Sequence, residues 1–175
     1  MLTVFGFFVA WIRWRRSELR RDEVLRWADE CIEALQTLLL ISLLKGPPLT
    51  EEKLDEIRLK IIFDTSTLIE RGRLFFKNEV INDFGSEKPA AYRGYRPRIL
   101  DHLVLAHQIS RYWPDESEDD IKSRSKLAEQ CLKNFVSLVQ KEVGRDRAAS
   151  EEAIKGGDGV NLSMEMRNLQ RVRNT

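Results

Sequence analysis

The sequence predicts an all-α protein, an antiparallel bundle of about four helices whose long first helix begins with a hydrophobic membrane anchor. Two observations predict the bundle. Apolar residues recur at spacings of three and four in four separate segments, which is the period of helices with one buried face. Glycine and proline interrupt this pattern between the segments, as they do at helix ends. A third observation predicts the anchor: the chain opens on a wholly uncharged stretch, residues 1–12.

Residues 1–16 form the predicted anchor, which precedes a helical bundle at 17–143. Arginine beside tryptophan at the end of an apolar run is typical of a membrane interface. The residues of this kind here are Trp11, Arg13, Trp14, Arg15 and Arg16. A bilayer-spanning helix needs about 20 apolar residues, which is more than this run contains. Three interpretations therefore stay open: a short single-pass anchor, an interfacial helix, or an apolar helix buried against a partner.

The first helix of the bundle is predicted to continue to about Lys45, because Gly46, Pro47 and Pro48 follow. Thr50 is the predicted N-cap of the second helix. Gly72 is its predicted C-cap. The short link between these two helices indicates that they lie antiparallel.

A third helix is predicted to begin at Pro97, which suits the first helical position, and to end before Pro114. Ser117 is the predicted N-cap of a fourth helix, which runs to about Val143. The remaining residues, 144–175, are mostly polar and contain three glycines within 156–159. They are predicted to form a flexible tail.

Residues 72–97 lack a helical period and are predicted to form an ordered loop, with a short helix at 78–84. Arginine binds phosphate or carboxylate through two parallel hydrogen bonds, and glycine lets backbone N–H groups approach an anion. The candidate anion-binding residues are Arg71, Arg73, Arg93, Arg96 and Arg98, with aromatic support from Phe75, Phe76, Tyr92 and Tyr95. In the alternative interpretation, the arginines pair with Glu70, Asp101 or the acidic run 115–120, and the rings fill the core.

The sequence indicates no catalytic residue, no metal site and no cofactor. It contains no fixed phosphate-binding motif and no nucleophile elbow. His102 and His107 lie about 140° apart around a helix, so they do not face one metal ion. Cys31 and Cys131 occupy apolar positions of helical patterns and are expected to be buried thiols. A net charge of +1 makes nucleic acid an unlikely partner.

We therefore expect a non-enzymatic interaction or regulatory module that is tethered to the cell membrane. Its expected partners are the membrane, through the N-terminal segment, and another protein or a second copy of the chain. The positive-inside rule would place the bulk of the chain in the cytoplasm. Two alternatives stay open: a sensor of a phosphorylated ligand (a nucleotide or lipid headgroup) at the arginine-aromatic loop, and a membrane-active effector that oligomerises in lipid.

Overall fold

The structure, a computed structural model, describes residues 2–43, 49–113 and 118–144. Four helices account for most of them: α1 (Leu2–Leu43), α2 (Glu51–Phe75), α3 (Arg98–Arg111) and α4 (Glu118–Val143). The described ranges hold no β-strand, only an isolated bridge between Glu79 and Tyr95. The prediction of an all-α protein with four packed helices is confirmed. Residues 1–144 form one compact unit. Apart from Gly144, the predicted tail at 144–175 lies outside the described residues.

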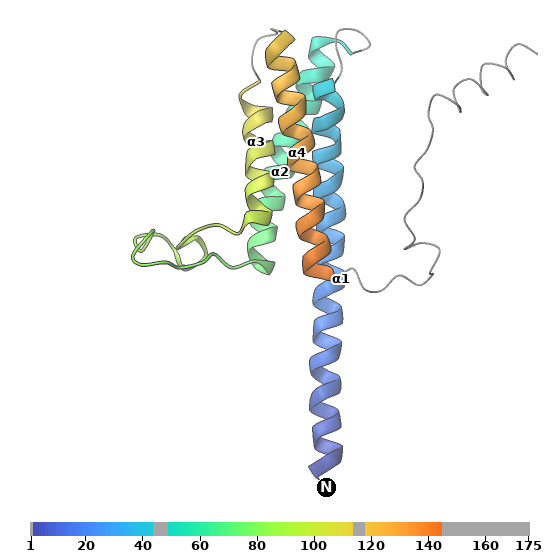
Figure 1. Cartoon of the computed structure of the whole chain (residues 1–175), viewed down its shortest axis with the longest axis vertical. Helices are drawn as coiled ribbons and strands as arrows, with labels where there is room; N and C mark the ends of the chain where they lie inside the picture. Colours follow the sequence, from blue (N-terminus) through green and yellow to red (C-terminus); the bar gives the residue numbers. More distant parts are fainter. Residues whose placement is uncertain (1, 44–48, 114–117, 145–175) are drawn as a thin grey trace, which may run out of the picture. The chain divides into compact units, whose positions relative to one another are not determined.

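The four helices run alternately up and down, and α4 closes the bundle against α1 (Figure 1). Each helix packs against the next one in the sequence. An ion pair between Arg20 and Glu142, 2.9 Å long, joins α1 to the C-terminal end of α4. Further along the same pair of helices, the rings of Trp27 and Phe135 lie 5.6 Å apart. These two contacts define the antiparallel register of α1 and α4.

The core is centred on Trp27, which is fully buried. Its indole N–H donates a 2.9 Å hydrogen bond to the carbonyl oxygen of Leu68. The rings of Phe75 and Phe76 pack 6.1 and 5.4 Å from the Trp27 ring. A buried tryptophan whose N–H finds an acceptor combines a large apolar contact area with a satisfied polar group. Periodicity identified this face of α1, but not Trp27 as its centre, because spacing says nothing about the surface packed opposite.

The start of α2 was predicted correctly and its end was not. Oγ1 of Thr50 accepts a 3.3 Å hydrogen bond from the backbone N–H of Lys53, as an N-cap does. The predicted C-cap at Gly72 is wrong, because α2 continues to Phe75. Gly72 is buried within the helix, where a Cβ atom would lie 2.4 Å from Cδ2 of Leu100. This glycine therefore permits close packing of helices and does not reverse the chain.

The remaining boundaries differ from prediction in detail. α3 begins at Arg98, so Pro97 is its N-cap and not its first residue. The helix predicted at 78–84 is absent, and the segment between α2 and α3 holds only a short 3₁₀ turn, η1 (Ala90–Tyr92). A positive φ at Asn82 (51°) lies within the expected helix and another at Gly85 (73°) lies just after it, so turns stand in its place. α4 ends at Val143 as predicted, while its predicted cap Ser117 lies outside the described ranges.

The first helix is long, as predicted, but its proposed role as a membrane-spanning anchor is not supported. No described helix combines the length and the hydropathy that a bilayer crossing requires. The physical reason is the arginine cluster that begins at Arg13. Residues 2–12 make about 16 Å of helix, roughly half the hydrocarbon thickness of a bilayer.

Candidate functional site

The candidate site lies in the loop at 76–97, which stands out to the side of the bundle between α2 and α3 (Figure 1). The two strands of chain at its base are joined by reciprocal backbone hydrogen bonds between Glu79 and Tyr95, 2.9 and 2.8 Å long. Gly94, at a φ of +80°, makes this closure possible, because a Cβ atom there would lie 2.3 Å from the Glu79 carbonyl oxygen. The loop is thus a closed, internally hydrogen-bonded element.

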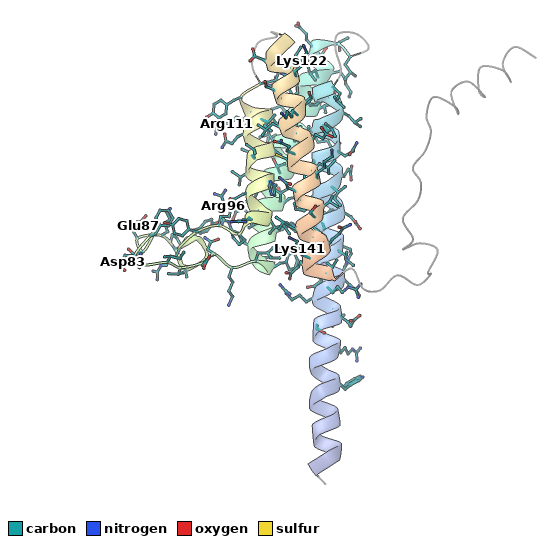
Figure 2. All side chains as sticks on the ribbon, viewed as in Figure 1. Asp83, Glu87, Arg96, Arg111, Lys122 and Lys141 are labelled. Carbon is teal, nitrogen blue, oxygen red and sulfur yellow. The ribbon has the colours of Figure 1, made fainter. Side chains whose placement is uncertain are left out.

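Further backbone hydrogen bonds set the path of the loop beyond its base. The N–H of Gly94 donates to Phe84 at 3.1 Å, and the N–H of Lys88 donates to Gly85 at 3.0 Å. The first bond joins the two sides of the loop at Phe84 and Gly94, and the second closes a turn at residues 85–88. In Figure 2, Asp83 and Glu87 lie toward the outer end of the loop, and Arg96 lies where the chain returns to α3.

A hollow of about 460 Å³ opens beside the base of this loop. We call it the loop hollow. Its walls come from the end of α2, both sides of the loop and the first turn of α3. It is lined by Arg73, Asn78, Phe84, Lys88, Tyr92, Gly94, Tyr95, Arg96 and Asp101. Three cationic side chains therefore face one carboxylate, and three aromatic rings complete the wall.

Arg73 is held in place by two neighbours. Its Nε lies 3.2 Å from a carboxylate oxygen of Glu70, and its guanidinium lies 4.4 Å from the centre of the Tyr92 ring. The hydroxyl of Tyr92 donates a 2.6 Å hydrogen bond to the same carboxylate, which raises the pKa of Tyr92. These contacts fasten the loop to α2. The carboxylate of Glu70 also offsets much of the positive charge of Arg73.

Arg96 is less completely paired. Its Nη1 lies 3.5 Å from a carboxylate oxygen of Asp101, a long contact for an ion pair. Its Nε is buried and has no hydrogen-bond partner among the described residues. The side-chain oxygen of Asn78, in the same hollow, is also buried without one. Buried polar atoms in native proteins nearly always have a partner, whether protein, water or ligand.

The structure separates the other predicted arginines from this hollow. Arg71 forms a bidentate ion pair with Glu30 of α1, which raises the pKa of the guanidinium. Nε of Arg93 donates a 2.8 Å hydrogen bond to the carbonyl oxygen of Lys88. Arg98 is exposed in the first turn of α3 and does not line the hollow. Only Arg73 and Arg96 of the five predicted arginines are brought together.

The predicted aromatic residues also divide into two groups. Phe75 and Phe76 are partly buried and pack on Trp27, against the core. Tyr92 and Tyr95 line the loop hollow. The Tyr95 ring stacks on Phe84, with centroids 4.3 Å apart and planes 11° from parallel.

Sequence patterns did not identify Asn78, Phe84 and Lys88. The ammonium of Lys88 lies 5.3 Å from the centre of the Phe84 ring. Lys88 is the one basic residue between Lys77 and Arg93, which is a weak signal in itself. Its place in the hollow depends on the turns that fold the loop back.

The predicted membrane-interface residues belong to the part of α1 that precedes the bundle. The guanidinium of Arg15 lies 5.3 Å from the centre of the Trp11 ring, and Trp11 is exposed. The side chains of Arg13, Trp14 and Arg16 lie outside what the structure describes.

The cysteines are buried free thiols, as predicted. Burial raises the pKa of Cys131 to about 11 and raises that of Cys31 as well, with the charge of Glu30 adding to the effect. Both thiols are therefore poor nucleophiles at neutral pH.

His102 and His107 lie in different environments. Nδ1 of His107 lies 3.2 Å from Oγ1 of Thr65, which links α3 to α2. Partial burial lowers the pKa of His102.

Comparison of the chain with protein-family models, with curated proteins and with solved structures finds no match. A functional proposal for this chain therefore depends on its own geometry and chemistry.

Proposed function

We propose that the protein is a membrane-associated helical interaction module without catalytic activity, attached to the bilayer surface by the N-terminal part of α1. One observation carries the proposal: α1 continues well past the bundle as a helix with an uncharged N-terminal run (Figure 1). In this proposal the bundle lies on the cytoplasmic side and binds a protein partner or a second copy of the chain.

The point where α1 leaves the bundle is marked by Arg20. Its guanidinium donates a 3.2 Å hydrogen bond to the carbonyl oxygen of Phe75, the last residue of α2. The same side chain pairs with Glu142, next to the last residue of α4. Residues 2–19 therefore extend about 27 Å beyond the ends of α2 and α4.

The chemistry of this extension favours a bilayer surface. Residues 2–12 carry no charge, and arginines with tryptophans follow at once. An apolar segment too short to cross a bilayer can bury its side chains in one leaflet while adjacent basic residues meet anionic headgroups. Tryptophan is enriched at that depth, because its ring is apolar and its N–H is polar.

Flotation with lipid vesicles tests this attachment. The full chain is expected to float with vesicles of phosphatidylcholine and phosphatidylglycerol, and more weakly with phosphatidylcholine alone. Two variants separate the apolar and electrostatic contributions. Phe7→Asp with Phe8→Asp should abolish flotation. Changing Arg13, Arg15 and Arg16 together to glutamine should weaken binding to anionic vesicles about tenfold or more, since each basic residue near such a surface contributes about 1 kcal/mol.

A matched control removes three basic charges from α4, which lies within the bundle. Lys122, Lys126 and Lys133 changed together to glutamine should float like the unmodified protein. If this control loses as much binding as the arginine variant, attraction is non-specific and the proposed attachment is wrong. Absence of flotation by the unmodified chain would also refute it. Release of trapped dye from the vesicles would instead favour a membrane-active effector.

A further inference from the structure

The wall of the loop hollow holds more positively charged than negatively charged side chains. Arg73, Lys88 and Arg96 line it, and Asp101 is the one carboxylate that the described residues contribute to its wall. Arg73 is already paired with Glu70. Lys88 and Arg96 are thus the cations that remain available to a ligand.

Lys88 is exposed, and no carboxylate of the described residues pairs with it. Its ammonium lies over the face of Phe84, which is an attractive but weak contact. The chain turns at Gly85, whose φ of +73° is rarely adopted by residues with a Cβ atom, and Lys88 follows this turn. The turn therefore presents a strongly hydrated point charge at the mouth of the hollow.

Arg96 is the second cation available to a ligand, and its guanidinium differs in geometry from the ammonium of Lys88. Its buried Nε–H lacks a partner among the described residues, and its ion pair with Asp101 is 3.5 Å long. A guanidinium offers donors in a planar fork that matches two oxygens of one phosphate. An anion bound to this fork would satisfy donors that the folded chain leaves without good partners.

The aromatic side chains in the wall restrict what the rest of a ligand, beyond its phosphate, can be. Tyr92, Tyr95 and Phe84 line it, and the stacked pair of Tyr95 and Phe84 remains about half exposed. The volume of about 460 Å³ exceeds that of a bare phosphate ion and is typical of a small-molecule site. A ligand with a phosphate at one end and a ring or glycerol body at the other would contact both kinds of wall.

We propose that the loop hollow binds a small molecule through a terminal phosphate monoester, held by Arg96 and Lys88 and packed against Tyr92 and Tyr95. A soluble phosphorylated metabolite and a phosphate-bearing lipid headgroup share this chemistry. Asp101 opposes the bound anion and holds Arg96 when the hollow is empty. The site is independent of the membrane attachment of α1 proposed above.

Binding is tested by calorimetric titration of the full chain at constant ionic strength. The probes are inorganic phosphate, adenosine monophosphate and, by flotation, vesicles that contain phosphatidic acid in phosphatidylcholine. Arg96→Gln and Lys88→Gln should each weaken binding at least about tenfold. Asp101→Asn should tighten it about two- to fivefold, because a competing carboxylate is removed.

Arg98→Gln is the matched control. It removes the same charge two residues from Arg96, but Arg98 does not line the hollow. Its effect should stay within about twofold, because exposed charges are screened by salt. Circular dichroism and thermal melting verify that each variant is folded.

Saturable binding of the soluble probes, lost in Arg96→Gln and Lys88→Gln but kept in Arg98→Gln, supports a metabolite site. The same contrast seen only with phosphatidic acid vesicles supports a lipid headgroup as the source. Vesicle binding through α1 alone would be equal in all these variants, so the two proposals fail separately. The site is refuted if Arg98→Gln loses as much binding as Arg96→Gln, or if no probe binds saturably below about 10 mM.

Discussion

Replacing Gly72 with alanine would test how closely α2 packs on its neighbours. An added Cβ atom would lie 2.4 Å from Cδ2 of Leu100 and 2.9 Å from Cζ2 of Trp27. Both neighbours are fully buried, and Trp27 is further held by its hydrogen bond to Leu68. Neither side chain can give way without disturbing the centre of the core.

Two effects of this substitution oppose each other. Alanine in a helix interior is favoured over glycine by about 1 kcal/mol. Overpacking a well-filled core costs about 1–3 kcal/mol. Because both contacts of the new methyl group would be shorter than 3.0 Å, we expect the steric cost to lie in the upper part of that range, at about 2–3 kcal/mol. The free energy of unfolding should then fall by about 1–2 kcal/mol.

Equilibrium urea denaturation measures this change. With a slope of about 2 kcal/mol per molar urea, the midpoint should fall by roughly 0.5–1 M. Ser66→Ala, at an exposed position of the same helix, is the control and should leave the midpoint almost unchanged. If Gly72→Ala is as stable as the unmodified protein, or more stable, the close packing inferred here is refuted.

A double-mutant cycle identifies the clashing partner. Leu100→Ala alone should cost about 2–5 kcal/mol, because it leaves a cavity. In the Gly72→Ala background the new methyl group occupies part of that space. The cost of Leu100→Ala should therefore be smaller there by at least about 1 kcal/mol. Additive effects would show that the two positions do not touch.

Two further predictions concern the loop and the buried thiols. Gly94→Ala should open the base of the loop, because the residue has a φ of +80° and its Cβ atom would lie 2.3 Å from the Glu79 carbonyl oxygen. Hydrogen exchange at the Glu79 and Tyr95 amides should accelerate at least about tenfold without loss of helical circular dichroism. Unchanged protection would contradict this. Burial raises the pKa of Cys131 to about 11 from an ordinary value of 9.0, so the unfolded chain ionises first as pH rises. The stability present below pH 9 should decline toward pH 11 by up to about 1.4 kcal/mol per pH unit. Denaturation series in urea should show a shallower decline for Cys131→Ala, and equal slopes would argue against the raised pKa.

The four helices were predictable from the sequence because their signals are local. A spacing of three and four residues places Val24, Cys31 and Leu35 on one face, and the structure buries all three. Thr50 could be identified as an N-cap because its hydroxyl needs only the N–H of Lys53, three residues along the chain. The uncharged run at 2–12 and the arginines after it are equally plain in the sequence.

The candidate site was only partly predictable, because its members are brought together by turns and not by spacing. The arginine-aromatic composition pointed to the loop that contains the hollow, but it did not distinguish among the five arginines. In the structure Arg71 forms an ion pair with Glu30 of α1, whereas Arg96 lines the hollow together with Lys88. Which carboxylate lies near which guanidinium depends on the register of α1 and α2 and on the fold of the loop.

The sequence by itself therefore determined the class of the fold and the approximate ends of its helices, since these depend on contacts within a few residues. Only the tertiary structure decided the role of Gly72, the central place of Trp27 and the membership of the loop hollow. Each of these depends on a surface contributed by a distant part of the chain: Leu100 against Gly72, Leu68 beside Trp27, and Asp101 opposite Arg96. Such contacts depend on the register in which the helices pack, and a local sequence pattern does not determine that register.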